Sequence, residues 1–328
     1  MTDIAFGESH MHVILRSLQI LNVALLLLPA AQGRAHQTDG PPQATTSPAP
    51  AAAIQVAPSK PLPDIVTMMH DVERNQRKAE AIEKDYICHS VEVQEQTDSS
   101  GHVKKTAISE YDHYWSEGVP VHRLVRKDGK DLSPSELAKQ DDHIRKEVEK
   151  ARERRAKSEA EGKPTNARGD EIITVSRLLE LGRFSNPRRV ELGGRETIAV
   201  DYDGDRSAKT RNRAEEVIRD LRGTVWVDEN DEVMVRAEGY FANGFKIGAG
   251  LLINIQKGTC FQMQQTKING EVWSPSHIEA YGAARALLFF NFSGNIRVDY
   301  STYRKLRTTS VVLPGVTKVD GEQPPSVP

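Results

Sequence analysis

The stretch that decides the fold of this chain is Leu221-Arg-Gly-Thr-Val-Trp-Val-Asp228, followed after a polar turn by Val233-Met-Val-Arg-Ala-Glu238. Branched and aromatic residues alternate with smaller or charged ones on both sides of the turn, which is the pattern of a β-hairpin. Alternation puts every second residue on the same side of a strand, so one face is expected to carry an apolar set: Val225, Val227, Val233, Val235 and Ala237. The hairpin therefore predicts an antiparallel sheet with one buried face.

More strand patterns follow the hairpin at close spacing. They are expected near Ile247–Ile255, Cys260–Ile268, Glu271–His277, Arg285–Phe292 and Gly294–Tyr300. Helical patterns lie in the first half, where Asp64 is placed to cap one helix. Ser133-Pro-Ser-Glu136 has the capping-box pattern of a second, long and highly charged helix that continues to about Glu161. We therefore predict an α+β fold, with helices on one face of a curved antiparallel sheet.

The N-terminal segment has a different character. Arg16 precedes the mainly apolar block Leu18–Leu28, and a proline and small residues follow it. A basic residue, a short apolar block and small residues in this order are typical of a secretory signal peptide, and the block is too short to span a bilayer. We expect an exported, periplasmic protein, cleaved near Gly33 or Ala35, with Met11 as an alternative start.

These patterns divide the chain into four parts. The signal peptide is assigned to residues 1–35, and a Pro/Ala-rich linker without regular structure to residues 36–62. Proline prevents regular structure there, and too few apolar residues are present to bury. A single domain is expected over residues 63–312, with a helical insertion at about 133–161, and a disordered tail over residues 313–328.

The charge balance excludes two classes of partner. The chain has 44 Lys and Arg against 46 Asp and Glu, a formal net charge of -2. A nucleic-acid-binding protein shows a basic excess gathered on one face, and polybasic membrane docking needs the same excess. No second segment is apolar enough to cross a membrane, because the nearest, Ala283–Phe290, carries Arg285. We expect neither nucleic-acid binding nor a membrane span.

No motif in the sequence indicates a reaction, so we expect no enzyme, cofactor or metal. Nucleophile elbows, zinc-binding helices and phosphate-binding glycine loops are absent from the printed sequence. Asp201-Tyr-Asp-Gly-Asp205 suggests calcium, but Arg206 and Asn212 stand where a calcium loop needs glycine and glutamate. An acidic turn is expected there instead. Phe292–Ser293–Gly294 is interpreted as a turn at a strand end.

The chain has two cysteines, Cys88 and Cys260, both in expected strands. In an oxidising compartment they form a disulfide if their Cα atoms lie about 4.4–6.8 Å apart. The alternative is two buried thiols that never meet. Both interpretations remain open from the sequence.

Several motifs resemble those of a known fold group. They are the strand end Tyr114–Trp115, the segment Gly118-Val-Pro-Val-His-Arg-Leu-Val-Arg-Lys-Asp-Gly129, the hairpin from Leu221 to Asp228, and Gly270-Glu-Val-Trp-Ser-Pro275. In these segments the chain is similar to exported bacterial proteins of the outer-membrane lipoprotein-sorting (LolA/LolB-like) group. The resemblance implies a half-barrel, a strongly curved antiparallel sheet whose apolar concave side is covered by helices. It also implies a role in carrying or sensing lipoprotein acyl chains.

We therefore expect an exported, non-enzymatic protein that binds a lipid or lipoprotein acyl chain in an apolar cavity. Burying an acyl chain gains roughly 0.8 kcal/mol per CH₂, so such binding needs no special polar chemistry. The candidate cavity residues are Trp226, Leu251, Phe261, Met263, Trp273 and Phe289. One alternative is an interaction or envelope-signalling module with a filled core, which binds an envelope protein. A second alternative is a hydrolase with an unrecognised site.

Overall fold

The computed structural model describes residues 60–247, 253–286 and 290–306. The expected signal peptide, nearly all of the linker and the tail beyond residue 306 lie outside the described residues. So do two of the candidate cavity residues, Leu251 and Phe289. Each of these assignments stays a prediction.

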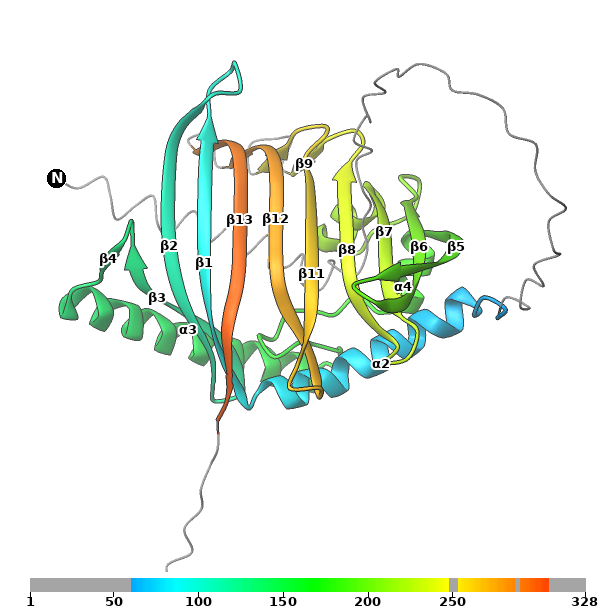
Figure 1. Ribbon diagram of the computed structural model, residues 1–328, viewed down its shortest axis with the longest axis horizontal. Helices are drawn as coiled ribbons and strands as arrows, with labels where there is room; N and C mark the ends of the chain where they lie inside the picture. The colour runs from blue at the N-terminus through cyan, green and yellow to red at the C-terminus, as the bar shows by residue number, and fades with distance from the viewer. Residues whose placement is uncertain (1–59, 248–252, 287–289, 307–328) are drawn as a thin grey trace, which may run out of the picture.

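The described part of the chain forms one large, unclosed and curved antiparallel sheet with few helices, as expected (Figure 1). Its edges are β4 and β5. The order across the sheet is β4 (Lys130–Asp131), β3 (Val119–Lys127), β2 (Val103–Ser116), β1 (Tyr86–Thr97), β13 (Phe290–Lys305), β12 (Val272–Ala286), β11 (Cys260–Ile268), β8 (Val233–Phe241), β7 (Leu221–Asp228), β6 (Arg195–Gly204) and β5 (Gly182–Leu192). Two short strands, β9 (Phe245–Ile247) and β10 (Ile253–Ile255), extend it beside β12.

The helix α2 (Ile65–Glu83) covers the apolar face of the sheet near β8 and β12. Asp64 caps it as expected, since its side chain accepts a hydrogen bond of 2.8 Å from the backbone N–H of Thr67. Met68, Met69 and Val72 enter the main core cluster with strand residues and with the short helices α4 (Val175–Leu181) and α5 (Arg213–Arg219). Burial of this apolar stripe fixes the helix on the sheet.

The long charged helix is α3 (Pro134–Ala160), and Ser133 and Glu136 complete its capping box as expected. Its narrow apolar stripe, Ile144, Val148 and Ala151, packs on Val119 and Val121 of β3 in a second cluster. Figure 1 shows α3 at the β1–β4 end of the sheet and α2 toward the other end. The two helices thus cover different regions.

Two strand expectations need correction. A β-bulge at Trp226–Val227 makes Met234, rather than Val235, the partner of Val227, so Met234 joins the core cluster. The single strand expected over Ile247–Ile255 is instead the antiparallel pair β9 and β10. The pairing of β10 with the end of β12 requires this reversal, because β11 pairs with β12 only as far as Tyr281.

Two expected turns are strands. Ser293 and Gly294 lie inside β13, where a Cβ on Gly294 would collide with the backbone of Glu95. The glycine therefore permits a close approach of two strands, with a φ of 149°. Asp201 and Asp203 lie in β6, because their carboxylates pair with arginines of neighbouring strands rather than closing an acidic loop.

Candidate binding site

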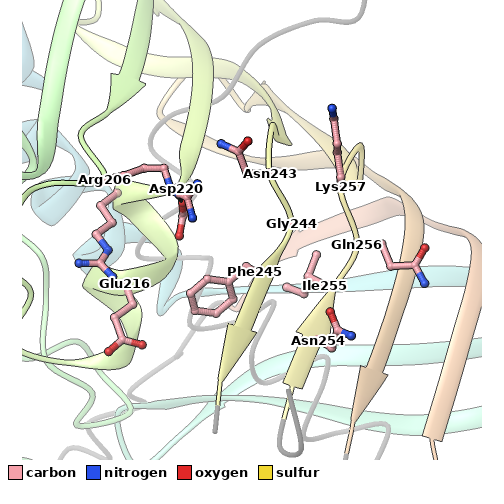
Figure 2. A pocket seen from close by; sticks show the side chains of 11 residues that line it. Arg206, Glu216, Asp220, Asn243, Gly244, Phe245, Asn254, Ile255, Gln256 and Lys257 are labelled. Carbon is pink, nitrogen blue, oxygen red and sulfur yellow. Dashed lines mark ion pairs between the residues drawn. The ribbon is translucent and has the colours of Figure 1, made fainter. Parts of the chain in front are cut away.

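One hollow in the described part of the chain lies between β9 and the C-terminal end of α5 (Figure 2). Its volume is about 850 Å³. Most of its lining residues are charged or carry side-chain amides: Arg206, Glu216, Arg219, Asp220, Asn243, Asn254, Gln256 and Lys257, with Gly244, Phe245 and Ile255 completing the wall. We call this the β9 hollow. It suits a polar ligand with both hydrogen-bond donors and acceptors.

The charges of the β9 hollow do not all cancel. Arg206 and Asp220 form an ion pair with 2.6 Å between Nε and Oδ1. The Arg219 guanidinium donates from Nη1 to the carbonyl oxygen of Ala208 at 3.1 Å. Its Nε is buried without a hydrogen-bond acceptor among the described residues. A buried donor without an acceptor is costly, so the hydrogen-bonding capacity of the Arg219 guanidinium is only partly satisfied within the described residues.

A second hollow, of about 470 Å³, lies where α3 crosses β1 and β2. Ile87, Tyr114, Trp115 and Leu306 supply most of its apolar wall, and Asp112, Arg123, Asp141 and Arg304 add charges. Arg123 and Asp141 are joined by two hydrogen bonds of 2.6 and 2.9 Å, which hold α3 on the sheet. We call this the α3 hollow. Its mixed lining suits an amphipathic group.

Two of the candidate cavity residues, Phe261 and Met263, are part of the filled core. They are 6% and 4% exposed and belong to the same cluster as Met68 and Met69 of α2. Neither residue lines the β9 hollow or the α3 hollow. Their side chains are therefore in contact with the protein's own apolar groups.

The two candidate tryptophans lie apart from this cluster. Trp226 pairs with Arg236 across β7 and β8, and that guanidinium lies 5.2 Å from the centre of its ring. Trp273 donates from Nε1 to Asp231 Oδ2 at 2.9 Å, and Arg195 lies over its ring. Each indole has a cation over its ring, so the four candidates among the described residues do not form one wall.

In the structure the two cysteines do not form a disulfide. Cys88 and Cys260 are free thiols. They lie on β1 and β11, with β13 and β12 between them. Three strand spacings of about 4.8 Å separate the cysteines by more than twice the span of a disulfide. Burial raises the pKa of the Cys88 thiol to about 11.

Three polar side chains in a row, Ser90, His113 and His122, resemble a nucleophile with its base. Ser90 Oγ lies 2.7 Å from His113 Nε2, and the second ring nitrogen of His113 lies 3.3 Å from His122 Nδ1. Burial lowers the pKa of His113 to about 4. However, Ser90 is only 1% exposed and sits mid-strand between β2 and β13. A substrate cannot reach its hydroxyl, so this chain of side chains is structural.

The described residues contain no cluster of three or more His, Cys, Asp or Glu residues that could hold a metal ion. No helix among them has both the length and the apolar character needed to cross a membrane.

The sequence did not single out the residues of the β9 hollow. Asn243 and Gly244 follow one strand and Gln256 and Lys257 follow another, so each pair has the appearance of a polar turn. Only the pairing of β9 with β10 places the two pairs together opposite α5.

Neither a protein-family model nor a curated protein matches this chain. Solved structures with a similar fold include a domain assigned to outer-membrane lipoprotein sorting from Vibrio parahaemolyticus, at 11% identity and a TM-score of 0.35. That match covers 75% of this chain and 94% of the other. A DUF1329 family protein from Desulfovibrio piger matches at 11% identity and a TM-score of 0.34, covering 74% and 94%.

A LolA superfamily protein from Nitrosomonas europaea matches at 12% identity and a TM-score of 0.31, covering 72% of this chain and 93% of the other. Two of these three descriptions thus name the fold group that the sequence resembles. At these identities and TM-scores the likeness is one of fold alone.

Proposed function

We propose that this chain is an exported, non-enzymatic binding protein that recognises a partner protein of the cell envelope through its polar surface. The observation that carries the proposal is the filled core. Phe261 and Met263, placed by the sequence in an apolar cavity, pack with Met68 and Met69 of α2. An acyl chain at that position would have to displace side chains that are already close-packed.

The position of the β9 hollow supports a partner with polar groups. Its lining offers amides from Asn243, Asn254 and Gln256 and charges of both signs. Such groups fix the orientation of a ligand through hydrogen bonds, and transient protein interfaces use the same chemistry.

A second candidate function, binding of a lipid or lipoprotein acyl chain, is favoured by the α3 hollow. Ile87, Trp115 and Leu306 offer apolar contact there, and Arg304 adds a positive charge for an acidic head group. At about 470 Å³ the hollow is within the usual size of a small-ligand site. This candidate places the ligand beside α3 rather than beneath α2.

Native mass spectrometry of the protein purified from an exporting bacterial host separates the two candidates. The proposed function predicts the mass of the processed chain alone, with nothing stoichiometric in a solvent extract. It also predicts that a photo-crosslinking residue at Asn243 gives a discrete adduct with an envelope protein, whereas one at Lys146 on α3 does not. An unprocessed chain would contradict export.

A stoichiometric lipid, with no adduct at Asn243, would overturn the proposed function in favour of the second candidate. Then Trp115→Ala should weaken binding of the fluorescent probe N-phenyl-1-naphthylamine at least tenfold. Trp226→Ala is the matched control, because Trp226 does not line the α3 hollow and should leave probe binding unchanged.

A further inference from the structure

The sheet has an open edge at the β9 hollow. β8 ends at Phe241 and β11 pairs with β12 only as far as Tyr281, but β12 continues to Ala286 and pairs with β10. β10 in turn pairs with β9, and β9 has no other partner among the described strands. In Figure 2, Arg206, Glu216 and Asp220 lie on the side of β9 away from β10, and the hollow extends from them across β9 to residues of β10.

An edge strand presents unpaired backbone N–H and C=O groups, which are a template for another extended chain. Peptide recognition by strand addition uses this template for affinity and the flanking side chains for specificity. A volume of about 850 Å³ beside the edge leaves room for a short extended segment. Asn243, Asn254 and Gln256 line the hollow and add side-chain amides near this edge.

The charges of the hollow indicate which peptide fits. Its lining carries three cationic side chains, Arg206, Arg219 and Lys257, and two acidic ones. Arg206 is already paired with Asp220. Arg219 keeps a buried Nε–H without an acceptor among the described residues. A carboxylate is the acceptor that a guanidinium binds best, because the hydrogen bond is charge-assisted.

We propose that the β9 hollow binds an extended peptide segment of a partner protein, which adds as a strand to the free edge of β9 and places an Asp or Glu side chain against Arg219. The proposal rests on the proposed function and specifies the chemistry of the partner. It assigns backbone recognition to Phe245–Ile247 and side-chain selection to Arg219 and Lys257.

The test is selection of binders from a phage-displayed library of random dodecapeptides against the processed full-length protein. Enriched peptides should share one acidic position, and a synthetic copy should lose at least tenfold in affinity when that residue becomes Asn or Gln. The Arg219→Gln variant of the protein should bind the unchanged peptide at least tenfold more weakly than the wild type does. Arg297→Gln is the control, since Arg297 is an exposed arginine of β13 that does not line the hollow.

Lys257→Glu provides a second variant at an exposed position, where a substitution has little effect on the stability of the fold. It should weaken the same peptide several-fold. Hydrogen exchange with bound peptide should slow at Phe245–Ile247 and not at the edge strand β5. Peptides that bind Arg219→Gln and Lys257→Glu as tightly as the wild type would overturn this site but leave the proposed function intact. No enrichment, together with a stoichiometric lipid, would overturn both.

Discussion

The pKa values of two glutamates, Glu83 at the end of α2 and Glu229 just after β7, are shifted in opposite directions. Glu83, the last residue of α2, accepts a hydrogen bond of 3.4 Å from Ser274 Oγ, and burial raises its pKa from 4.5 to about 7. Glu229 accepts two hydrogen bonds from Arg189 and pairs with Lys60, and these cations lower its pKa to about 2. Burial dominates at Glu83, whereas pairing dominates at Glu229.

Replacement of Glu83 by Gln should stabilise the protein, and more so at high pH. The folded state resists ionisation of Glu83, so the wild type loses stability as the pH rises from about 4.5 through 7. The neutral amide avoids that loss. Urea unfolding should give a gain of about 1–3 kcal/mol at pH 8 and little change at pH 5. An equal gain at both pH values would contradict the raised pKa.

Replacement of Glu229 by Gln should have the opposite pH dependence. The depressed pKa means that the carboxylate stabilises the fold above pH 4.5 and that this contribution disappears as the pH falls toward 2. The variant should lose roughly 1–3 kcal/mol of unfolding free energy at pH 7 and much less near pH 3. Unfolding curves that shift equally at pH 7 and pH 3 would show that the pairing with Arg189 is not responsible.

At the scale of an element, α3 is attached to the sheet by a small cluster of its own. Ile144, Val148 and Ala151 contact Val119 and Val121, and this cluster is separate from the one beneath α2. The sequence predicted the start of α3, its length and its narrow apolar stripe, because capping and helical spacing are local properties. The strand on which these apolar residues of α3 pack, β3, depends on the tertiary structure.

Val148→Asp should detach α3 without unfolding the rest of the sheet. A buried unpaired carboxylate costs several kcal/mol, more than the small cluster with β3 can offset. Hydrogen exchange should become fast over Pro134–Ala160 and stay slow at Met68 and Met69 of α2. Lys146→Asp, at an exposed position of the same helix, is the control and should leave the exchange of α3 unchanged. Global unfolding by Val148→Asp would show that α3 belongs to the core.

At the scale of the whole molecule, the strand order brings distant parts of the chain together. β1 pairs with β13, so that His89 stands opposite Ser301 and the ends of the described chain share one sheet. The same order places two strands between Cys88 and Cys260. The spacing of residues along the chain contains neither fact.

The thiols offer a direct check of this strand order. Unfolded protein purified without reductant should give two free thiols per chain with Ellman's reagent, and Cys88→Ser should give one. In the folded state the Cys88 thiol should react slowly at pH 8, because its raised pKa leaves little thiolate. Fewer than one free thiol in the unfolded wild type would mean that the two cysteines are joined.

Much of the fold was predictable because it depends on local pattern. Alternation predicted the β7–β8 hairpin, and capping residues predicted α2 and α3. The wrong predictions lie where the pairing between strands departs from the regular alternation of residues along one strand. The bulge at Trp226–Val227 placed Met234 in the main core cluster, whereas Val235 is buried outside that cluster. β12 continued through residues interpreted as a boundary between two strands.

The sequence by itself determined the α+β class, the antiparallel sheet, the capped helices and the apolar composition of one sheet face, since these follow from residue periodicity and side-chain chemistry over a few neighbours. Only the tertiary structure decided that Phe261 and Met263 fill a core with α2, that the cysteines stay apart, and that β9 faces α5 across a polar hollow. These features depend on which strands pair across long sequence separations, and that choice is made by the packing of the whole sheet.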